Sequence, residues 1–356
     1  MSLEELRKRI DKLDIELVKL LNERAKVVVE VGKIKQESDA PVYAPDREKI
    51  VFEKIAAANE GPLPERCLQA IWRELMSGSF ALERPLRIAY LGPAGSFSHN
   101  AAVLKFGQSV DYEAVMDIRG IFEEVAKGHC DLAIVPVENS SGGSVIETFD
   151  AFIESDVMIC AELYMAIHHN LLANGPVDKV EKVYSKPEVF AQCRNWLAAT
   201  FKQANTIAVA SSAKAAQMAA QEPGAAAIGS RIAGELYGLK IQCENIEDVS
   251  NNVTRFLIIA KTDTKPTGDD KTAILLSTAH KTGALADVLN VFKQFGINLT
   301  NITSRPSKKR QWEYYFFVDC LGHKNDEALA KGLIQARQHC LQLSILGSFP
   351  RSETVV

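Results

Sequence analysis

The sequence predicts a multidomain protein in which an all-helical segment is followed by an α/β segment and then by a small α+β segment. Three observations support this prediction. Residues 1–84 show only helical hydrophobic periodicity, residues 86–262 alternate short β-like runs with helix-like ones, and residues 271–350 follow the order βαββαβ. The length of 356 residues agrees with several folding units, because one domain usually takes about 100 to 200 residues. We therefore expect three domains with these boundaries.

The composition excludes several classes of protein. The chain is 47% hydrophobic and 24% charged, as expected of a soluble globular protein. Its 41 basic and 45 acidic residues leave a net charge of -4, which favours neither a nucleic-acid binder nor a polybasic membrane anchor. The N-terminus is charged and helix-periodic, unlike a signal peptide, and no run of about 18 apolar residues occurs. We expect a cytoplasmic protein that binds neither nucleic acid nor a membrane.

The cysteines and histidines do not form a metal-ligand pattern. The 7 cysteines are odd in number and dispersed, and no two have Cys-x-x-Cys spacing. This argues against a disulfide framework and against a zinc cluster. His168 and His169 are adjacent, but neighbours on a strand face opposite ways, so a shared metal is not expected. The sequence predicts no metal site.

The first segment begins with one long helix. Ser2 and Glu5 form a capping-box pattern, and an apolar seam with heptad spacing follows. The helix should run from about residue 3 to 37, roughly 50 Å at ~1.5 Å per residue, which is too long to bury its seam within a short domain. We expect it to pack against a second copy of the chain, and two further helices to follow between breaks at 39–45 and 61–64. The seam positions are Leu6, Ile10, Leu13, Leu17, Leu20, Arg24, Val27, Val31 and Ile34.

Arg24 interrupts this apolar seam. A guanidinium is costly there unless it meets an anion or a buried partner, so we expect Arg24 to bind a negative group. Lys35 follows eleven residues later, and at ~100° per residue both cations lie on one face of the helix. Arg7 lies ~25 Å away and ~100° around the helix, so only an antiparallel partner chain can bring it to the same place. The spacing alone allows either a dimeric anion pocket or one structural ion pair among surface charges.

Five short motifs run through residues 1–84. They are Leu6-Arg7-x-x-Ile10-Asp11-x-Leu13-Asp14, Leu21-Asn22-Glu23-Arg24, Val29-Glu30-Val31-Gly32-Lys33-Ile34-Lys35, Asp46-Arg47-Glu48 and Ser79-x-x-x-Glu83. With them the segment resembles the small all-helical chorismate mutases of the intertwined-dimer type. The resemblance implies an isomerase that rearranges chorismate to prephenate without a nucleophile or a cofactor, using cations to clamp a reactive conformer. The implied catalytic residues are Arg7 from the partner chain, Arg24 and Arg47 on carboxylates, Lys35 and Glu83 on the ether oxygen, Glu48 on the hydroxyl, and Ser79.

Polar side chains follow the strands predicted in the second segment. The turn from Leu91 to His99 lies between a strand and a helix, where backbone N–H groups can bind an anion, although such a turn is often only a turn. Asn139 and Ser140 follow a buried strand, and residues 251–256 open the last apolar strand. Each could also be ordinary turn and cap chemistry. The predicted strands are 87–91, 131–137, 206–210, 225–229 and 253–260.

The triplet Thr254-Arg255-Phe256 is the most specific motif of this segment, together with 226–231 and 236–239. Residues 86–262 resemble prephenate dehydratases, in which two α/β lobes of periplasmic-binding-protein type enclose the substrate. The resemblance implies a lyase that expels CO2 and hydroxide from prephenate, with Thr254 as the candidate acid. Arg255 either binds a carboxylate or orders the strand, if its side chain points away from Thr254. The implied substrate-binding residues are Ser96, Ser98, Asn139, Ser140, Arg255 and Phe256.

The third segment has a ferredoxin-like order of elements. Its predicted strands are 272–279, 297–304, 312–321 and 341–349, and its helices are 283–295 and 325–340. Gly283-Ala284-Leu285 forms one motif, and Asn298-Leu299-Thr300 with Ser304-Arg305-Pro306 forms another. With these two motifs the segment resembles the ACT regulatory domains that sense phenylalanine. Those domains carry Glu-Ser-Arg-Pro in the second motif, and Thr303 stands here in place of the glutamate. The implied effector-binding residues are Gly283, Ala284, Leu285, Asn298, Leu299, Thr300, Ser304 and Arg305.

The order of the three segments resembles the bifunctional chorismate mutase-prephenate dehydratase family of phenylalanine biosynthesis. The resemblance implies chorismate and prephenate as substrates, L-phenylalanine as allosteric effector, no cofactor, and a homodimer or tetramer. The alternative is a non-enzymatic amino-acid sensor with a helical dimerisation arm. That alternative gives no reason for Arg24, Lys35 and Arg47 in one helical segment.

Overall fold

The computed structural model describes residues 1–38, 40–201, 204–307, 314–352 and 354–356. The chain forms two compact units. The first comprises residues 1–44, 52–86 and 106–111, and the second comprises 45–51, 87–105 and 112–356. Trp312, the expected start of one strand, lies outside the described residues. Among the described residues, no helix is both long and apolar enough to cross a membrane.

The first unit consists of helices. Helix α1 (Leu3–Glu37) begins at the predicted capping box, in which the Glu5 N–H donates to Ser2 Oγ at 3.2 Å and the Ser2 N–H donates to Glu5 Oε2 at 2.6 Å. Helix α3 (Glu65–Glu83) packs against α1 near Gly32, where an added Cβ would lie 3.0 Å from Glu83 Cα. The first residues of helix α2 (Pro45–Ala58), 45–51, belong to the second unit. The prediction of an all-helical N-terminal segment is confirmed.

The first lobe of the second unit is built on a mixed sheet of order β2-β1-β3-β11-β5, with β4 paired to β3. The pair β1/β3 is parallel, and β11 is antiparallel to both of its neighbours. The chain leaves this sheet after β5 and returns as β11, so the second lobe is an insertion. The elements are β1 (Arg87–Leu91), α4 (Phe97–Phe106), β2 (Asp111–Val115), α5 (Ile118–Lys127), β3 (Leu132–Asn139), β4 (Gly143–Ser144), α6 (Ile146–Glu154), β5 (Met158–Ala166) and β11 (Val253–Ala260).

The second lobe is a five-stranded sheet of order β10-β6-β9-β7-β8 with its own apolar core. The two lobes confirm the predicted two-lobed α/β architecture. The elements are β6 (Asn170–Ala173), the 3-10 turn η1 (Val177–Lys179), β7 (Lys182–Ser185), α7 (Pro187–Gln192), α8 (Arg194–Thr200), β8 (Asn205–Ala208), α9 (Ser212–Gln221), β9 (Ala225–Gly229), α10 (Arg231–Tyr237) and β10 (Lys240–Cys243).

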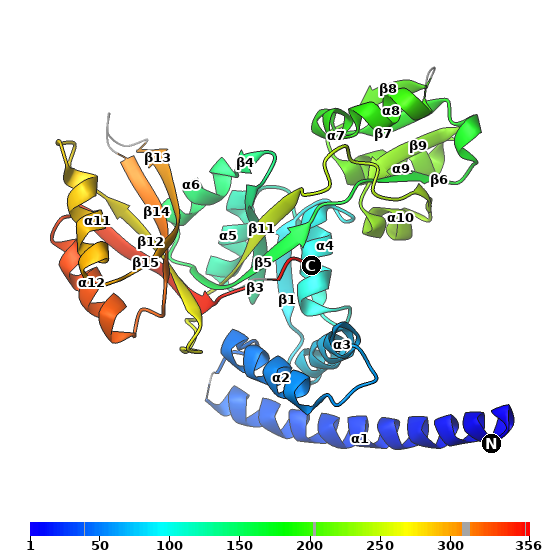
Figure 1. Cartoon of the computed structure of the whole chain (residues 1–356), viewed down its shortest axis with the longest axis horizontal. Helices are drawn as coiled ribbons and strands as arrows, with labels where there is room; N and C mark the ends of the chain where they lie inside the picture. Colours follow the sequence, from blue (N-terminus) through cyan, green and yellow to red (C-terminus); the bar gives the residue numbers. More distant parts are fainter. Residues whose placement is uncertain (39, 202–203, 308–313, 353) are drawn as a thin grey trace. The chain divides into compact units, whose positions relative to one another are not determined.

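The C-terminal sheet has the order β13-β14-β12-β15, and its chain order confirms the βαββαβ prediction. Helices α11 and α12 lie on one of its faces (Figure 1), where they share a core with Ile274, Val318 and Leu343. Residues of the other face, among them Leu275 and Phe317, belong to the core of the first lobe. The elements are β12 (Asp270–Ser277), α11 (Ala284–Gln294), β13 (Leu299–Pro306), β14 (Tyr314–Leu321), α12 (Glu327–Arg337) and β15 (Gln342–Pro350).

Candidate active sites and effector pocket

Arg24 meets a hydroxyl of the neighbouring helix. Its Nη1 donates to Ser79 Oγ at 2.8 Å, and Ser79 in turn donates to the Leu75 carbonyl oxygen at 2.6 Å. Ser79 is buried, and Arg24 is half-buried. No described acidic side chain forms an ion pair with Arg24. A half-buried guanidinium bound to a neutral hydroxyl retains its capacity to bind an anion.

Lys35 lies at the same contact between α1 and α3. Its Nζ is 2.7 Å from Glu83 Oε2 and donates to the Val42 carbonyl oxygen at 3.0 Å. The absence of a side chain at Gly32 lets α3 approach α1 here. Because Ser79 and Glu83 are i, i+4 neighbours, about 6 Å apart on one face of α3, the head groups of Arg24 and Lys35 converge to within one helical turn. The site combines two cations, a hydroxyl and a carboxylate.

Three further residues were predicted for this site. Arg7 is exposed near the start of α1. Arg47 and Glu48 lie in the first turn of α2, within the second compact unit. There the Glu48 carboxylate is 2.7 Å from Lys105 Nζ, with both side chains mostly buried.

Thr254 and Asn139 lie opposite one another on adjacent strands of the first lobe. Asn139 Nδ2 donates to Thr254 Oγ1 at 2.8 Å and to Asn252 Oδ1 at 2.7 Å. Asn139 Oδ1 accepts from the N–H groups of Ser141 and Gly142, so its amide is fixed in orientation. The described residues supply no acceptor for the proton of Thr254. Its hydroxyl therefore accepts a hydrogen bond from the protein and can donate one to a ligand.

Asn252 belongs to this constellation but was not among the predicted site residues. It is buried, and its side chain connects the start of β11 to Asn139. Asn252 lies next to Asn251 in a sequence typical of a turn, which gives no sign of a functional role. The only signal in the sequence is its position two residues before Thr254. Its carbonyl oxygen also accepts from the Ile167 N–H at 2.8 Å, which joins the two chain crossings between the lobes.

The predicted serines hold loops in the structure. Ser96 Oγ donates to the Leu91 carbonyl oxygen at 2.8 Å and accepts from the His99 N–H at 3.2 Å. Ser140 Oγ donates to the Asn251 carbonyl oxygen at 3.3 Å and accepts from the Val253 N–H at 3.0 Å. Both hydroxyls thus have backbone partners. Ser98 is buried in the first turn of α4.

Arg255 and Phe256 are both buried in the structure. The Arg255 side chain binds Glu162 and Asp319 and lies on the face of β11 opposite Thr254, because neighbouring residues of a strand alternate. These ion pairs favour the interpretation in which Arg255 orders the strand, and carboxylate binding by Arg255 stays an untested prediction. Phe256 is 1% exposed and packs within the core, and its contact with substrate stays a prediction.

The first turn of α4 carries a histidine, His99, whose protonation we expect to affect stability. The Gly95 N–H donates to His99 Nδ1 at 3.1 Å, and the His99 ring stacks on Tyr90 with centroids 4.7 Å apart. Burial lowers the pKa of His99 from its usual value. A protonated Nδ1 cannot accept the Gly95 bond, so the folded state binds a proton here more weakly than the unfolded chain does.

This difference predicts a pH dependence of stability. The unfolded chain takes up the His99 proton as pH falls through about 6.5 while the folded protein does not, so the free energy of unfolding declines below that pH. In a His99→Gln variant the side-chain oxygen can accept the same bond without titrating. We expect the melting temperature of the wild type to fall more steeply than that of the variant between about pH 7 and pH 5. Parallel curves in thermal unfolding would contradict this role of His99.

Gly283, Ala284 and Leu285 line a pocket of about 360 Å³ at the start of α11, together with His280, Lys281, Tyr314 and Phe316. Gly283 has φ +80°, a conformation that favours glycine. The second predicted effector motif does not line this pocket. Asn298 and the β13 residues Leu299, Thr300 and Ser304 lie elsewhere, and Arg305 forms an ion pair with Asp150 at 2.9 Å.

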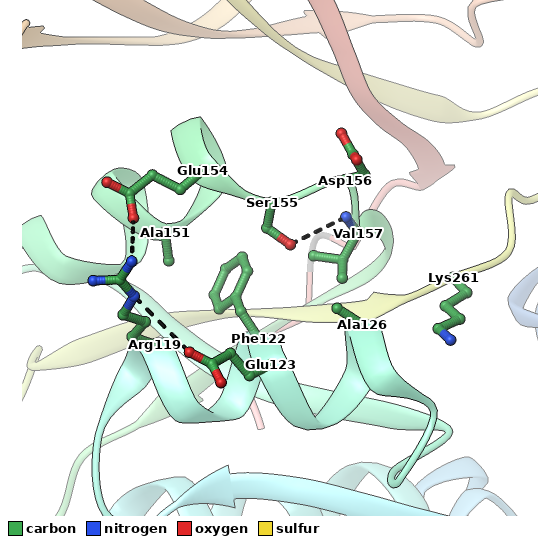
Figure 2. A pocket seen from close by; sticks show the side chains of 10 residues that line it. All are labelled: Arg119, Phe122, Glu123, Ala126, Ala151, Glu154, Ser155, Asp156, Val157 and Lys261. Atoms are coloured by element: carbon green, nitrogen blue, oxygen red, sulfur yellow. Dashed lines mark hydrogen bonds and ion pairs between the residues drawn. The ribbon is translucent and has the colours of Figure 1, made fainter. Parts of the chain in front are cut away.

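Another pocket, of about 410 Å³, lies at α5 and α6 (Figure 2) and contains none of the predicted site residues. Arg119 crosses it, 3.1 Å from Glu154 and 4.0 Å from Glu123. These charges satisfy one another. Among the described residues, no group of three or more His, Cys, Asp or Glu side chains is placed to hold a metal ion.

The sequence matches three family models in the order of its segments. They are chorismate mutase type II over residues 6–84, prephenate dehydratase over 88–264 and the ACT domain over 272–336. The bifunctional chorismate mutase/prephenate dehydratase of Aquifex aeolicus is 44% identical over 356 residues, which cover 99% of this chain and 98% of that protein. The similarity therefore spans all three segments.

Two solved structures each resemble 75% of the chain. The prephenate dehydratase of Arthrobacter aurescens in complex with L-Phe is 29% identical with a TM-score of 0.69, and the match covers 75% of this chain and 90% of that one. The quorum quenching acylase GqqA is 26% identical with a TM-score of 0.70, covering 75% of this chain and 98% of that one. Proteins of this one fold thus have different names.

Proposed function

Because the chain belongs to the bifunctional chorismate mutase/prephenate dehydratase family, we propose that its two activities reside in two separate sites, within residues 1–84 and 86–262. The protein is an enzyme with chorismate mutase and prephenate dehydratase activities. The observation that most supports separate sites is the assignment of the paired cations Arg24 and Lys35 to one compact unit and of Thr254 to the other. We further propose 271–350 as a regulatory domain.

In the mutase site, Arg24 and Lys35 would act as a clamp. Chorismate carries two carboxylates, and its rearrangement requires a compact conformer in which charge builds on the breaking ether oxygen. Arg24 can exchange its neutral partner Ser79 for a carboxylate, while the Lys35 ammonium, held by Glu83, can donate to the ether oxygen. Fixed cations of this kind lower the barrier because they are already oriented when the charge develops.

Arg7, Arg47 and Glu48 are the further residues that the resemblance implies for the mutase reaction. Arg7 would come from a second chain, because it lies ~25 Å from Arg24 along the same straight helix. Most of the predicted seam of α1 is exposed in one chain, with Ile10 at 55% and Leu20 at 61%. An apolar stripe of this length needs a partner, so we propose a homodimer through α1.

In the dehydratase site, Thr254 would protonate the departing hydroxyl. Prephenate loses CO2 from its ring carboxylate, the released electron pair makes the ring aromatic, and hydroxide leaves as water once it has received a proton. Thr254 can deliver that proton because its oxygen already accepts from Asn139 and its O–H points to no described protein acceptor. The driving force comes from aromatisation, so orientation of the hydroxyl is the main task of the protein.

L-Phenylalanine would bind the pocket at the start of α11 and inhibit the dehydratase. The support is that Gly283 opens a helix there, whose N–H groups can bind a carboxylate, and that the Arthrobacter relative is in complex with L-Phe. Aromatic residues Tyr314 and Phe316 of the same pocket suit the phenyl ring. A ligand regulates only if it favours one arrangement over another.

Thr303 predicts how strongly this regulation acts. The related motif carries a glutamate where Thr303 stands, and threonine supplies no negative charge for an ammonium group. Thr303 does not line the pocket at the start of α11 within one chain, so a carboxylate at this position would reach the bound amino acid from a second chain. In that arrangement we expect Thr303→Glu to bind L-phenylalanine more tightly, with half-inhibition of the dehydratase at a correspondingly lower concentration. Calorimetric titration beside the inhibition assay measures both. Equal affinity in the two proteins would show that Thr303 is not the determinant.

One experiment tests the proposed function. The purified protein is incubated with chorismate, and prephenate and phenylpyruvate are followed separately; a second incubation begins from prephenate. Two sites predict transient prephenate in the first reaction and phenylpyruvate in both. A non-enzymatic sensor would bind phenylalanine and consume neither substrate.

A further inference from the structure

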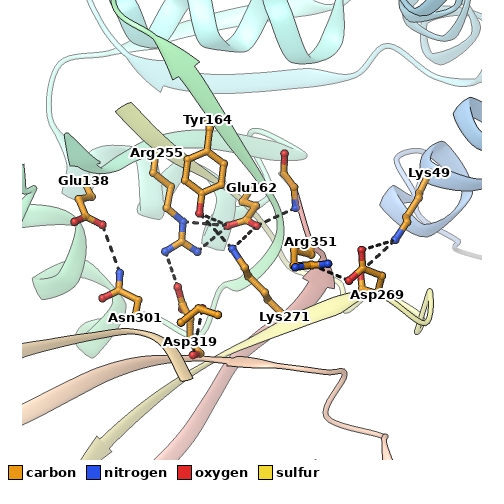
Figure 3. A network of polar contacts seen from close by, with 12 residues as sticks. Lys49, Glu138, Glu162, Tyr164, Arg255, Asp269, Lys271, Asn301, Asp319 and Arg351 are labelled. Atoms are coloured by element: carbon orange, nitrogen blue, oxygen red, sulfur yellow. Dashed lines mark hydrogen bonds and ion pairs between the residues drawn. The ribbon is translucent and has the colours of Figure 1, made fainter. Parts of the chain in front are cut away.

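A buried group of four charges connects the strand that carries Thr254 to the C-terminal sheet (Figure 3). Arg255 lies on β11, Glu162 on β5, Lys271 on β12 and Asp319 on β14. Their side chains are 7%, 0%, 9% and 12% exposed, respectively. Two cations and two anions balance, which buried charges require.

Arg255 is the centre of this group. Its Nε donates to Glu162 Oε2 at 3.0 Å, its Nη2 lies 2.9 Å from the same oxygen, and its Nη1 donates to Asp319 Oδ2 at 2.5 Å. Burial acts to lower the pKa of Arg255, but the carboxylates of Asp319 and Glu162 outweigh it and the pKa is raised. The guanidinium is therefore always charged, and each carboxylate fixes one side of its planar head.

The backbone of β11 is irregular at Arg255, the residue that forms these ion pairs. Thr254 pairs with Asn139 and Arg255 with Glu138, but the register of β11 against β3 shifts between Arg255 and Phe256. A bulge of this kind bends a strand and re-aims the neighbouring side chain. The position of the Arg255 guanidinium therefore influences the orientation of the Thr254 hydroxyl.

The C-terminal sheet packs closely against the first lobe, so a movement of the sheet would shift the ion pair between Asp319 and Arg255. Phe317, two residues before Asp319 and on the same face of β14, meets Phe149 of the first lobe with ring centroids 4.6 Å apart. Leu275 and Leu257 belong to the same core cluster. A displacement of β14 therefore displaces Asp319 relative to β11.

We propose that Arg255 is a positioning residue for Thr254, held from the C-terminal sheet by Asp319, so that a rearrangement of that sheet changes the dehydratase site through this ion pair. The proposal rests on the proposed role of Thr254 in dehydration. It adds the path by which the regulatory segment reaches that site.

The test compares Asp319→Asn with a control at the same interface. Asn301 donates to Glu138 at 3.4 Å from the neighbouring strand β13, so Asn301→Ala removes a contact between the same two sheets without a buried charge (Figure 3). We expect Asp319→Asn to lower kcat for prephenate by about 10- to 100-fold, the scale of a ~1 Å misplacement, with KM changed by less than about threefold. Amide hydrogen exchange across 251–257 should accelerate in the same variant. Asn301→Ala should leave both unchanged, and Asp319→Glu should restore part of kcat.

A folded Asp319→Asn protein overturns the proposal if it has wild-type kcat or if it has wild-type exchange across 251–257. If that variant does not fold, Arg255→Lys, which keeps the charge but loses the two-sided fork, replaces it with the same expected results. A wild-type protein that does not dehydrate prephenate would refute the proposed function instead, and hydrogen exchange would then decide the ion pair's effect on β11. L-Phenylalanine should lower kcat of the wild type by a larger factor than that of Asp319→Asn, and equal factors would also overturn the proposal.

Discussion

Replacement of Arg24 by alanine is expected to lower chorismate mutase activity by about 10²-fold or more, the scale on which loss of one fixed charge-stabilising group acts. The guanidinium stands in the α1–α3 contact with only a neutral hydroxyl as its described partner, so a substrate carboxylate would be its strongest ligand. Dehydration of supplied prephenate should be unchanged, since Thr254 belongs to the other compact unit.

Thr254→Ala is the matched variant and should show the reverse pattern. Loss of a proton donor at the departing hydroxyl costs about 10²- to 10⁴-fold, while the mutase reaction should proceed at the wild-type rate. Thr254→Ser, which retains a hydroxyl that Asn139 can bind, should recover part of the activity. Each activity is measured with its own substrate, beside a melting curve that shows the variant is folded. A well-folded variant that loses both activities would contradict the assignment to two sites.

The helical site was largely predictable because helical geometry is local. The separation of eleven residues placed Arg24 and Lys35 on one face of α1, and in the structure they contact Ser79 and Glu83. Their pairing across α1 and α3 came from the resemblance and not from spacing. The close approach of the helices at Gly32 was not predicted, because a single glycine in a helical run does not show what it faces.

The strand β5 shows why other parts were not predicted. No expected strand covered residues 158–166, because Glu162 stands in the middle of this apolar run and disguises it. The charge of Glu162 is balanced there by Arg255 and Lys271, which are 93 and 109 residues away in the sequence. Arg255 was ambiguous for the same reason: its side-chain direction follows from alternation, but its partners are set by the packing of two sheets. The local sequence pattern does not show which distant residues will pair.

Exposure of the α1 seam leads to the second large effect, which concerns assembly. Arg7 and Arg24 lie on one helix too far apart to share a ligand, whereas an antiparallel pair of α1 helices would bring Arg7 of each chain toward Arg24 of the other. Arg7→Ala and Arg24→Ala homodimers should then both lack mutase activity, because every pocket contains the lesion.

Mixing these two inactive proteins under subunit exchange should restore mutase activity. A heterodimer contains one pocket with both substitutions and one pocket with neither, so random exchange of equal amounts should recover about a quarter of the wild-type activity. Two tags of different mass, read by native mass spectrometry, report how much heterodimer has formed. Mixing Arg24→Ala with Lys35→Ala is the control: both residues lie in the same chain's half of the pocket, so each heterodimer pocket keeps one lesion and no activity should return. Recovery in that control, or none in the Arg7 mixture despite abundant heterodimer, would show that Arg7 does not act across the dimer.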